Sequence, residues 1–218
     1  MSIEQTGAYR LKKYVAAVVF VLTFGMLGLG VLPPSVASAE VARTGPVSHT
    51  SPWGGYEELW VPSTMGNIKV QVQWAARGGN AALYLLDGLR ARDDANAWSF
   101  ETNALDQYRN DNITLVMPVG GESSFYSDWY APSNFNNQQV TYRWETFLTR
   151  ELPNFLANYG VSPNNNAVVG ISMGASAALT LAAYHRDQFK FAGALSGYPH
   201  ISALGMHGAI RLATIPFS

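Results

Sequence analysis

One segment of the chain limits its possible folds more than any other. It reads Ala167-Val-Val-Gly-Ile-Ser172-Met-Gly174-Ala-Ser-Ala-Ala, which is a short apolar run, a G-x-S-x-G motif and a run of small residues. This order predicts a strand, a sharp turn that holds Ser172, and a helix. Gly170 and Gly174 suit such a turn because neighbouring backbone must pass close to it. A helix that begins at Ser172 also favours developing negative charge there, through its free N–H groups and its dipole.

Composition excludes several classes of protein. The 218 residues predict one domain, or one domain with appendages. Only 13% of the residues are charged and the formal net charge is -1, so the chain lacks the basic stripe of a nucleic-acid binder. The absence of cysteine excludes disulfides, thiol nucleophiles and cysteine-based metal sites. We expect no nucleic-acid partner, no metal and no cofactor.

Residues 1–39 have the pattern of an export signal. Positive charges at Arg10, Lys12 and Lys13 precede an uncharged apolar stretch over 14–31, and Ala37-Ser-Ala39 fits an A-x-A cleavage site. The alternative is a retained N-terminal membrane anchor, because the stretch approaches spanning length. Three glycines and the Pro33-Pro34 pair favour cleavage near Ala39, and hence a secreted or cell-envelope protein. Residues 40–55, rich in Ser, Thr, Pro and Gly, are expected to form a flexible leader.

From residue 56 onwards, strand patterns alternate with helical ones. The first two strands are expected at 57–61 and 67–74. In the second, apolar and polar residues alternate strictly, which is typical of an antiparallel strand with one solvent-exposed face. Continuous apolar runs predict strands buried on both faces at 81–86, 113–118, 167–169 and 191–195. Between the second and third of these runs, a helix is expected over 141–159, kinked or restarted at Pro153 and ended by Gly160. The pattern predicts an α/β fold of the α/β-hydrolase type, with a mostly parallel sheet, antiparallel N-terminal strands and flanking helices.

A serine on such a turn can act as the nucleophile of an acyl transfer if backbone N–H groups stabilise the oxyanion that forms. In this fold one donor is the residue after the serine, here Met173. The second comes from the loop after the third strand, here Asp87-Gly-Leu-Arg90, with Leu89 as the candidate donor. The alternative is that Asp87-Gly88 is merely a turn.

The aromatic loop after the next strand reads Phe125-Tyr-Ser-Asp-Trp-Tyr130. Aromatic faces bind both lipids and sugars, so this loop could line a substrate site. A packed surface loop explains the same residues equally well, and the sequence leaves both readings open.

A serine nucleophile also needs a base, which this fold supplies as an acid and then a histidine after the serine. The only acid after Ser172 is Asp187, and the histidines there are His185, His200 and His207. His185 lies about 20 Å along the expected helix at a rise of about 1.5 Å per residue, which favours a role at the negative end of its dipole. His200 follows a strand and His207 lies in a helical stretch, but no acid follows either of them. No complete triad can be assembled.

Several stretches together resemble one family. They are Tyr84-Leu-Leu-Asp-Gly-Leu-Arg-Ala91, Val116-Met-Pro-Val-Gly-Gly121, Ser123-Ser-Phe-Tyr-Ser-Asp-Trp-Tyr130, Trp144-Glu-Thr-Phe-Leu148, Gly170-Ile-Ser-Met173 and Ala178-Leu-Thr-Leu-Ala-Ala-Tyr-His185. Over roughly residues 56–200 the chain is similar to the secreted antigen 85 mycolyltransferases and their corynebacterial relatives. The resemblance implies an acyltransferase that moves a mycolyl chain between trehalose mycolates, or onto arabinogalactan, through an acyl-serine.

The resemblance also implies roles for individual residues. It makes Ser172 the nucleophile and Leu89 and Met173 the oxyanion donors, and it places Asp87 and Arg90 against trehalose, whose hydroxyls suit a carboxylate and a guanidinium. The family's disulfide is absent, and residues 134–139 stand in its place.

The family's catalytic Glu and His would lie beyond residue 218. We therefore expect a C-terminally truncated member, in which residues 56–218 form an incomplete domain without its C-terminal strands and with little activity alone. The alternatives are a secreted carboxylesterase of the same fold and a non-catalytic fragment or binding protein.

Overall fold

The computed structural model describes residues 54–132 and 140–213. The expected export signal, nearly all of the leader and the segment 134–139 lie outside these ranges, and their predictions stay predictions. Within these ranges, no helix combines the length and apolar character needed to cross a membrane.

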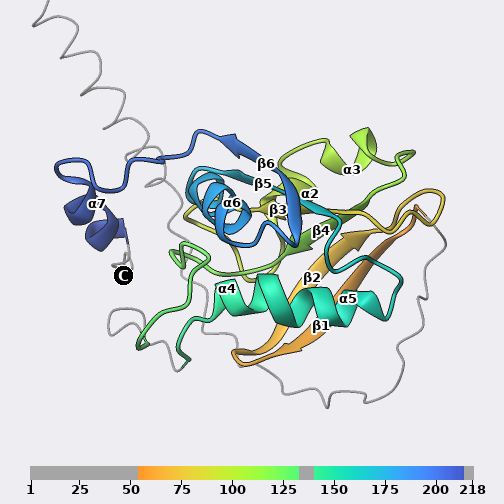
Figure 1. Ribbon diagram of the computed structural model, residues 1–218, viewed down its shortest axis with the longest axis horizontal. Helices are drawn as coiled ribbons and strands as arrows, with labels where there is room; N and C mark the ends of the chain where they lie inside the picture. Colours follow the sequence, from red (N-terminus) through yellow and green to blue (C-terminus); the bar gives the residue numbers. More distant parts are fainter. Residues whose placement is uncertain (1–53, 133–139, 214–218) are drawn as a thin grey trace, which may run out of the picture. The chain divides into compact units, whose positions relative to one another are not determined.

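The described part of the chain is built around a six-stranded sheet with the order β1-β2-β4-β3-β5-β6 (Figure 1). Its strands are β1 (Tyr56–Ser63), β2 (Gly66–Gln73), β3 (Ala82–Leu86), β4 (Thr114–Pro118), β5 (Asn166–Ile171) and β6 (Phe189–Leu195). The β1–β2 and β2–β4 pairs are antiparallel, whereas β4, β3, β5 and β6 run parallel. All six predicted strands are present, and the expected sheet with its antiparallel N-terminal strands is confirmed.

The two central strands β3 and β4 are buried at every position, as their continuous apolar runs predicted. Successive side chains of a strand point to opposite faces, so each strand contributes to two separate clusters. Tyr84 and Leu86 belong to the larger cluster on one face, while Leu83 and Leu85 belong to a smaller cluster on the other. The sheet is therefore the middle of three layers.

The solvent-exposed face predicted for β2 is present at Asn67 but is wrong for the second half of the strand. Gln71 and Gln73 are only 4% and 5% exposed. The Gln71 Oε1 atom accepts the N–H of Asn96 at 2.8 Å, and the Gln73 Nε2 atom donates to the carbonyl of Leu105 at 2.9 Å. A segment that holds the short helices α2 (Ala97–Phe100) and α3 (Ala104–Gln107) covers this face. The amides can be buried because the covering backbone satisfies their hydrogen bonds.

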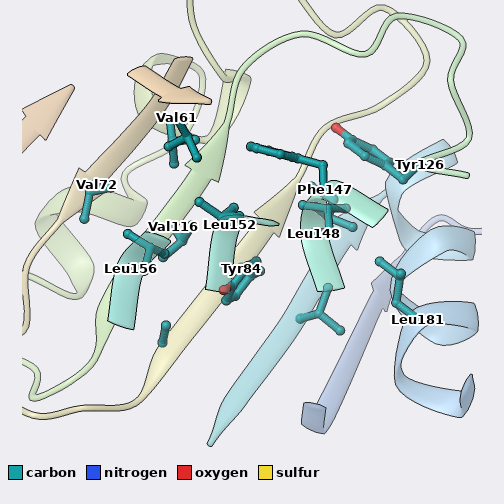
Figure 2. Packing of buried hydrophobic residues seen from close by; sticks show 14 of the residues in the cluster. Val61, Val72, Tyr84, Val116, Tyr126, Phe147, Leu148, Leu152, Leu156 and Leu181 are labelled. Carbon is teal, nitrogen blue, oxygen red and sulfur yellow. The ribbon is translucent and has the colours of Figure 1, made fainter. Parts of the chain in front are cut away.

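Further helical segments cover the opposite face of the sheet (Figure 1). They are α4 (Trp144–Thr146), the π-helical segment η1 (Phe147–Glu151), α5 (Leu152–Ala157) and α6 (Met173–Tyr184), and a final helix α7 (Met206–Ala213) follows β6. Figure 2 shows Phe147, Leu148, Leu152 and Leu156 among the strand residues of the larger cluster.

The helix expected over 141–159 spans the three segments α4, η1 and α5. Its π-helical turn ends at Glu151, two residues before Pro153, which has no N–H to donate and which crowds the preceding turn of an α-helix. The predicted irregularity at Pro153 is thus present as a widened turn, and Gly160, with a φ of 84°, follows the end of α5.

Candidate active site

The parallel strands β3, β4, β5 and β6 end at the same edge of the sheet, where ligands bind in open α/β sheets. Ser172 follows β5, the loop 87–90 follows β3, and the aromatic loop follows β4. The first two are in close proximity, since a Cβ built on Gly88 would lie 3.7 Å from the Ser172 Cβ. Three segments singled out in the sequence are therefore brought to one edge.

Ser172 has the backbone of a strained turn. Its φ of 54° and ψ of -113° place it at the N-cap of α6, in a left-handed region that costs an L-residue about 1 to 3 kcal/mol. Its N–H donates to the carbonyl of Leu195 at 2.8 Å, which fixes the turn to the end of β6. Its side chain is partly exposed and, among the described residues, makes no capping hydrogen bond to α6. The predicted strand, turn and helix are all present.

The two glycines of the motif permit this turn by their lack of a side chain. A Cβ on Gly170 would lie 2.1 Å from the carbonyl oxygen of Gly174. A Cβ on Gly174 would lie 2.4 Å from the carbonyl oxygen of Asp87 and 2.7 Å from that of Leu86. Real Cβ atoms do not approach backbone so closely, so both positions require glycine, and α6 begins directly against the end of β3.

The two amides predicted to stabilise an oxyanion both lie at this edge. Met173 is the first residue of α6, where an N–H group has no acceptor within the helix. Leu89 is partly buried in the turn after β3. Neither N–H donates a hydrogen bond to any other part of the chain that the structure describes. Their role as oxyanion donors stays a prediction.

Asp87 is 2% exposed and turns its carboxylate towards the protein interior. Both carboxylate oxygens accept the N–H of Ala97, at 3.1 and 3.0 Å, and so hold the start of α2. Burial of the carboxylate raises the pKa of Asp87 to about 6. The predicted contact between Asp87 and a sugar is not tested by this arrangement and stays a prediction.

Arg90 lies at the surface of the same loop. Its Nη1 atom is 2.7 Å from the Oε1 atom of Glu122, and both side chains are about half exposed. This ion pair links the loop after β3 to the loop after β4. The predicted sugar contact of Arg90 stays a prediction.

Polar groups of the aromatic loop after β4 form hydrogen bonds within the loop and to α4. The carbonyl of Ser124 accepts the indole N–H of Trp129 at 2.9 Å. Asp128 accepts the N–H and the hydroxyl of Thr146, at 3.0 and 2.6 Å, within the first turn of α4. These contacts support the packed-loop reading for most of the motif, whereas Tyr130 projects fully into solvent.

None of the histidines after Ser172 makes a hydrogen bond to it within the described residues. His185 is the C-cap of α6, as its expected position at the end of the helix implied. Its Nε2 atom lies 2.8 Å from the Oε1 atom of Glu145, a partner that its sequence distance of 40 residues had concealed. His200 lies in the loop after β6, and His207 lies in α7.

Comparison with known proteins shows what the chain is similar to. Residues 62–210 match the model of the family described as "Putative esterase". The diacylglycerol acyltransferase/mycolyltransferase Ag85B of Mycolicibacterium smegmatis is 47% identical over 195 residues, which are 88% of this chain and 57% of Ag85B. Ag85A of Mycobacterium tuberculosis H37Rv is 54% identical over 143 residues, which are 65% of this chain and 42% of Ag85A. The chain thus spans about half the length of the curated relatives it matches.

Solved structures show the same likeness. The crystal structure of Mycobacterium tuberculosis MPT51 (FbpC1) has a TM-score of 0.62 and 39% identity, over 72% of this chain and 56% of that one. The serine hydrolase FphF of Staphylococcus aureus has a TM-score of 0.55 over 69% of this chain and 61% of its own, and its 18% identity bears on the fold alone. The fold is accordingly of the α/β-hydrolase type, and because the family model matches most of its length, this chain belongs to that esterase family.

Proposed function

We propose that this chain is an acyltransferase that forms an acyl-serine at Ser172. The observation that carries the proposal is the strained backbone of Ser172 at the N-terminus of α6, with the loop 87–90 packed against it. At one edge of the sheet lie a partly exposed hydroxyl and two N–H groups that make no hydrogen bond within the described residues. The names of the relatives, which are acyltransferases, support the same chemistry.

The first half of the reaction joins the acyl group to the protein. The Ser172 Oγ atom attacks the ester carbonyl of the acyl donor, and its proton passes to a base. No histidine hydrogen-bonds Ser172 within the described residues, so we expect this step to be slow in the chain alone. The N–H groups of Leu89 and Met173 bind the oxyanion, which resembles the transition state more than the substrate does. The C–O bond to the donor alcohol then breaks, the alcohol leaves with a proton, and the acyl-serine remains.

The second half transfers the acyl group to a new alcohol. A sugar hydroxyl attacks the acyl-serine, and Ser172 is released with its proton. We propose trehalose mycolates or similar acyl-sugar lipids as donors, and trehalose mycolates or arabinogalactan as acceptors. Arg90 and Asp87 are the proposed sugar contacts, and Arg90, which is exposed, is the more accessible of the two. No metal or cofactor takes part in these steps.

A carboxylesterase is the competing function, and the description of the family favours it. Both functions share the acyl-serine, and they differ in whether water or a sugar hydroxyl attacks it. The test is to give the purified chain a labelled long-chain acyl donor with and without trehalose, and to separate acyl-trehalose from free acid. A trehalose-dependent acyl-sugar product supports the transferase, whereas free acid alone makes the chain an esterase. Loss of both products in Ser172→Ala assigns them to this site.

The location of the chain is also a proposal. We infer that residues 1–39 direct export and are removed near Ala39, which leaves residues 56–218 as the catalytic region in the cell envelope. N-terminal sequencing of the exported protein tests this, since it should begin at Glu40. A mature protein that still contains the stretch 14–31 would instead indicate a retained anchor.

A further inference from the structure

We infer that Tyr126 is a positioning residue for the loop that carries the Leu89 amide. This inference rests on the function proposed above and adds a residue to it. Tyr126 lies in the aromatic loop after β4, and its hydroxyl accepts the N–H of Asp87 at 2.9 Å. Asp87 is the first residue after β3 and lies two positions before Leu89, so the hydroxyl fixes the start of the segment that must hold the oxyanion donor.

Other contacts hold the same two segments together. The N–H of Ser123 donates to the carbonyl of Leu89 at 2.9 Å. The N–H of Phe125 lies 3.2 Å from the Sδ atom of Met173, the other proposed donor residue. The segment 123–126 therefore contacts Asp87, Leu89 and Met173, the residues around both proposed oxyanion amides.

The segment is itself held in an unfavourable backbone conformation. Ser123, Phe125 and Tyr126 all have positive φ angles, of 54°, 54° and 49°. Residues in this region persist when their surroundings fix them, and such strain gathers at functional sites. The surroundings here are substantial, because Tyr126 is 2% exposed and its ring meets the ring of Trp144 edge-on at 5.5 Å.

The aromatic loop begins with close packing of Gly121 against Trp144. A Cβ on Gly121 would lie 2.8 Å from the Cε2 atom of Trp144, so the chain passes directly over this indole. Figure 2 shows the Tyr126 ring beside the larger core cluster, to which it belongs. A core-anchored aromatic ring thus presents a hydroxyl to the end of β3, which gives the loop after β3 a rigid support.

The test compares Tyr126→Phe, which removes only the hydroxyl, with Tyr84→Phe. Tyr84 is equally buried, but its ring packs in the core against Phe189 and it lies outside the loops of the site. Acylation is followed as the rapid release of p-nitrophenol from p-nitrophenyl octanoate, with Ser172→Ala as the background. Melting temperatures are recorded for every variant, and hydrogen exchange is recorded at Asp87.

A poorly positioned oxyanion donor lowers the rate of the chemical step rather than substrate binding. We expect Tyr126→Phe to lower kcat by about tenfold with KM little changed, since loss of a whole donor costs about 100-fold or more. The Asp87 amide should exchange faster, and Tyr84→Phe should keep the wild-type rate. Met173→Leu, which conserves volume but removes the sulfur that faces Phe125, should also lower kcat.

The inference is overturned if Tyr126→Phe acylates as fast as Tyr84→Phe, or if it raises KM and leaves kcat unchanged. If Tyr126→Phe does not fold, full activity of Met173→Leu overturns it. If the wild-type chain shows no release that depends on Ser172, the proposed function fails and this inference fails with it. Release at the wild-type rate in Tyr126→Phe, together with loss of release in Ser172→Ala, removes only the role of Tyr126 and leaves the proposed function standing.

Discussion

Gly174 lies so close to Asp87 that a Cβ atom on the glycine would be 2.4 Å from the Asp87 carbonyl oxygen. This approach joins the start of α6 to the end of β3, the two places from which the proposed oxyanion donors come. A side chain at Gly174 would push the two elements apart, so the structure ties the geometry of the site to the packing of one glycine.

Gly174→Ala should lower the free energy of unfolding by about 1 to 3 kcal/mol, because the added methyl group overpacks a buried contact. The matched control is Gly208→Ala in α7, where a Cβ would meet no atom within 4 Å. Since alanine favours a helix more than glycine does, the control should be neutral or slightly stabilising. Urea unfolding of both variants measures the difference, and equal stability of the two would contradict the close approach.

Asp87→Asn should change the pH dependence of stability. The pKa of Asp87 is raised to about 6 in the folded protein by burial, whereas an unfolded aspartate has a pKa of about 3.9. The folded state therefore holds the proton more tightly, and this contribution to stability is full below about pH 4 and is lost as the pH rises through about 6. It amounts to at most about 3 kcal/mol.

The measurement is the free energy of unfolding from pH 4 to pH 7 for wild type and for Asp87→Asn. The difference between the two curves isolates Asp87 from the other titrating groups. Asparagine keeps an oxygen that can accept the Ala97 N–H, so the variant should fold. A wild-type curve parallel to that of the variant would show that Asp87 titrates normally.

His185→Ala should leave acylation of Ser172 unchanged. His185 pairs with Glu145 at the far end of α6 from Ser172, and both side chains are partly exposed. Exposed pairs contribute little, so the free energy of unfolding should fall by less than about 1 kcal/mol. Glu145→Gln should behave in the same way. A large loss of acylation rate in His185→Ala would instead make this histidine part of the chemistry.

Phe191→Lys should make the purified chain less prone to aggregate. Phe191 is 62% exposed on β6, which is at one edge of the described sheet. Exposed apolar edge strands pair with other chains, and a lysine on the edge opposes this. Tyr130→Lys is the control, because Tyr130 is fully exposed but lies outside the strands. Light scattering at increasing protein concentration should fall for the first variant only.

The sequence predicted those features that depend on local pattern. The strands followed from runs of apolar residues, and the turn at Ser172 followed from glycines at Gly170 and Gly174, because these signals are contained in a few neighbouring residues. The position of the loop after β3 could also be predicted, because it depends only on which strand precedes the loop.

Features that depend on contacts between distant segments could not be predicted. Gln71 alternates with apolar residues as a solvent-facing residue would, yet it is buried because the backbone of Asn96 binds it. The carboxylate of Asp87 accepts the N–H of Ala97, and nothing in the sequence next to Asp87 indicates this partner. The hydrogen bond between Tyr126 and Asp87 spans 39 residues, so it emerges only once the sheet has formed.

The central claim is that Ser172 carries the acyl group, and the most direct test is the mass of the intact protein after mixing with an acyl donor. A long-chain p-nitrophenyl ester should add one acyl group, and peptide mapping should locate it on Ser172. Ser172→Ala should show no adduct. The control is Ser176→Ala, in the same helix, because the Ser176 hydroxyl accepts the N–H of Tyr198. This variant should show the full adduct. No adduct on the wild-type chain, or an equal adduct on Ser172→Ala, would contradict the claim.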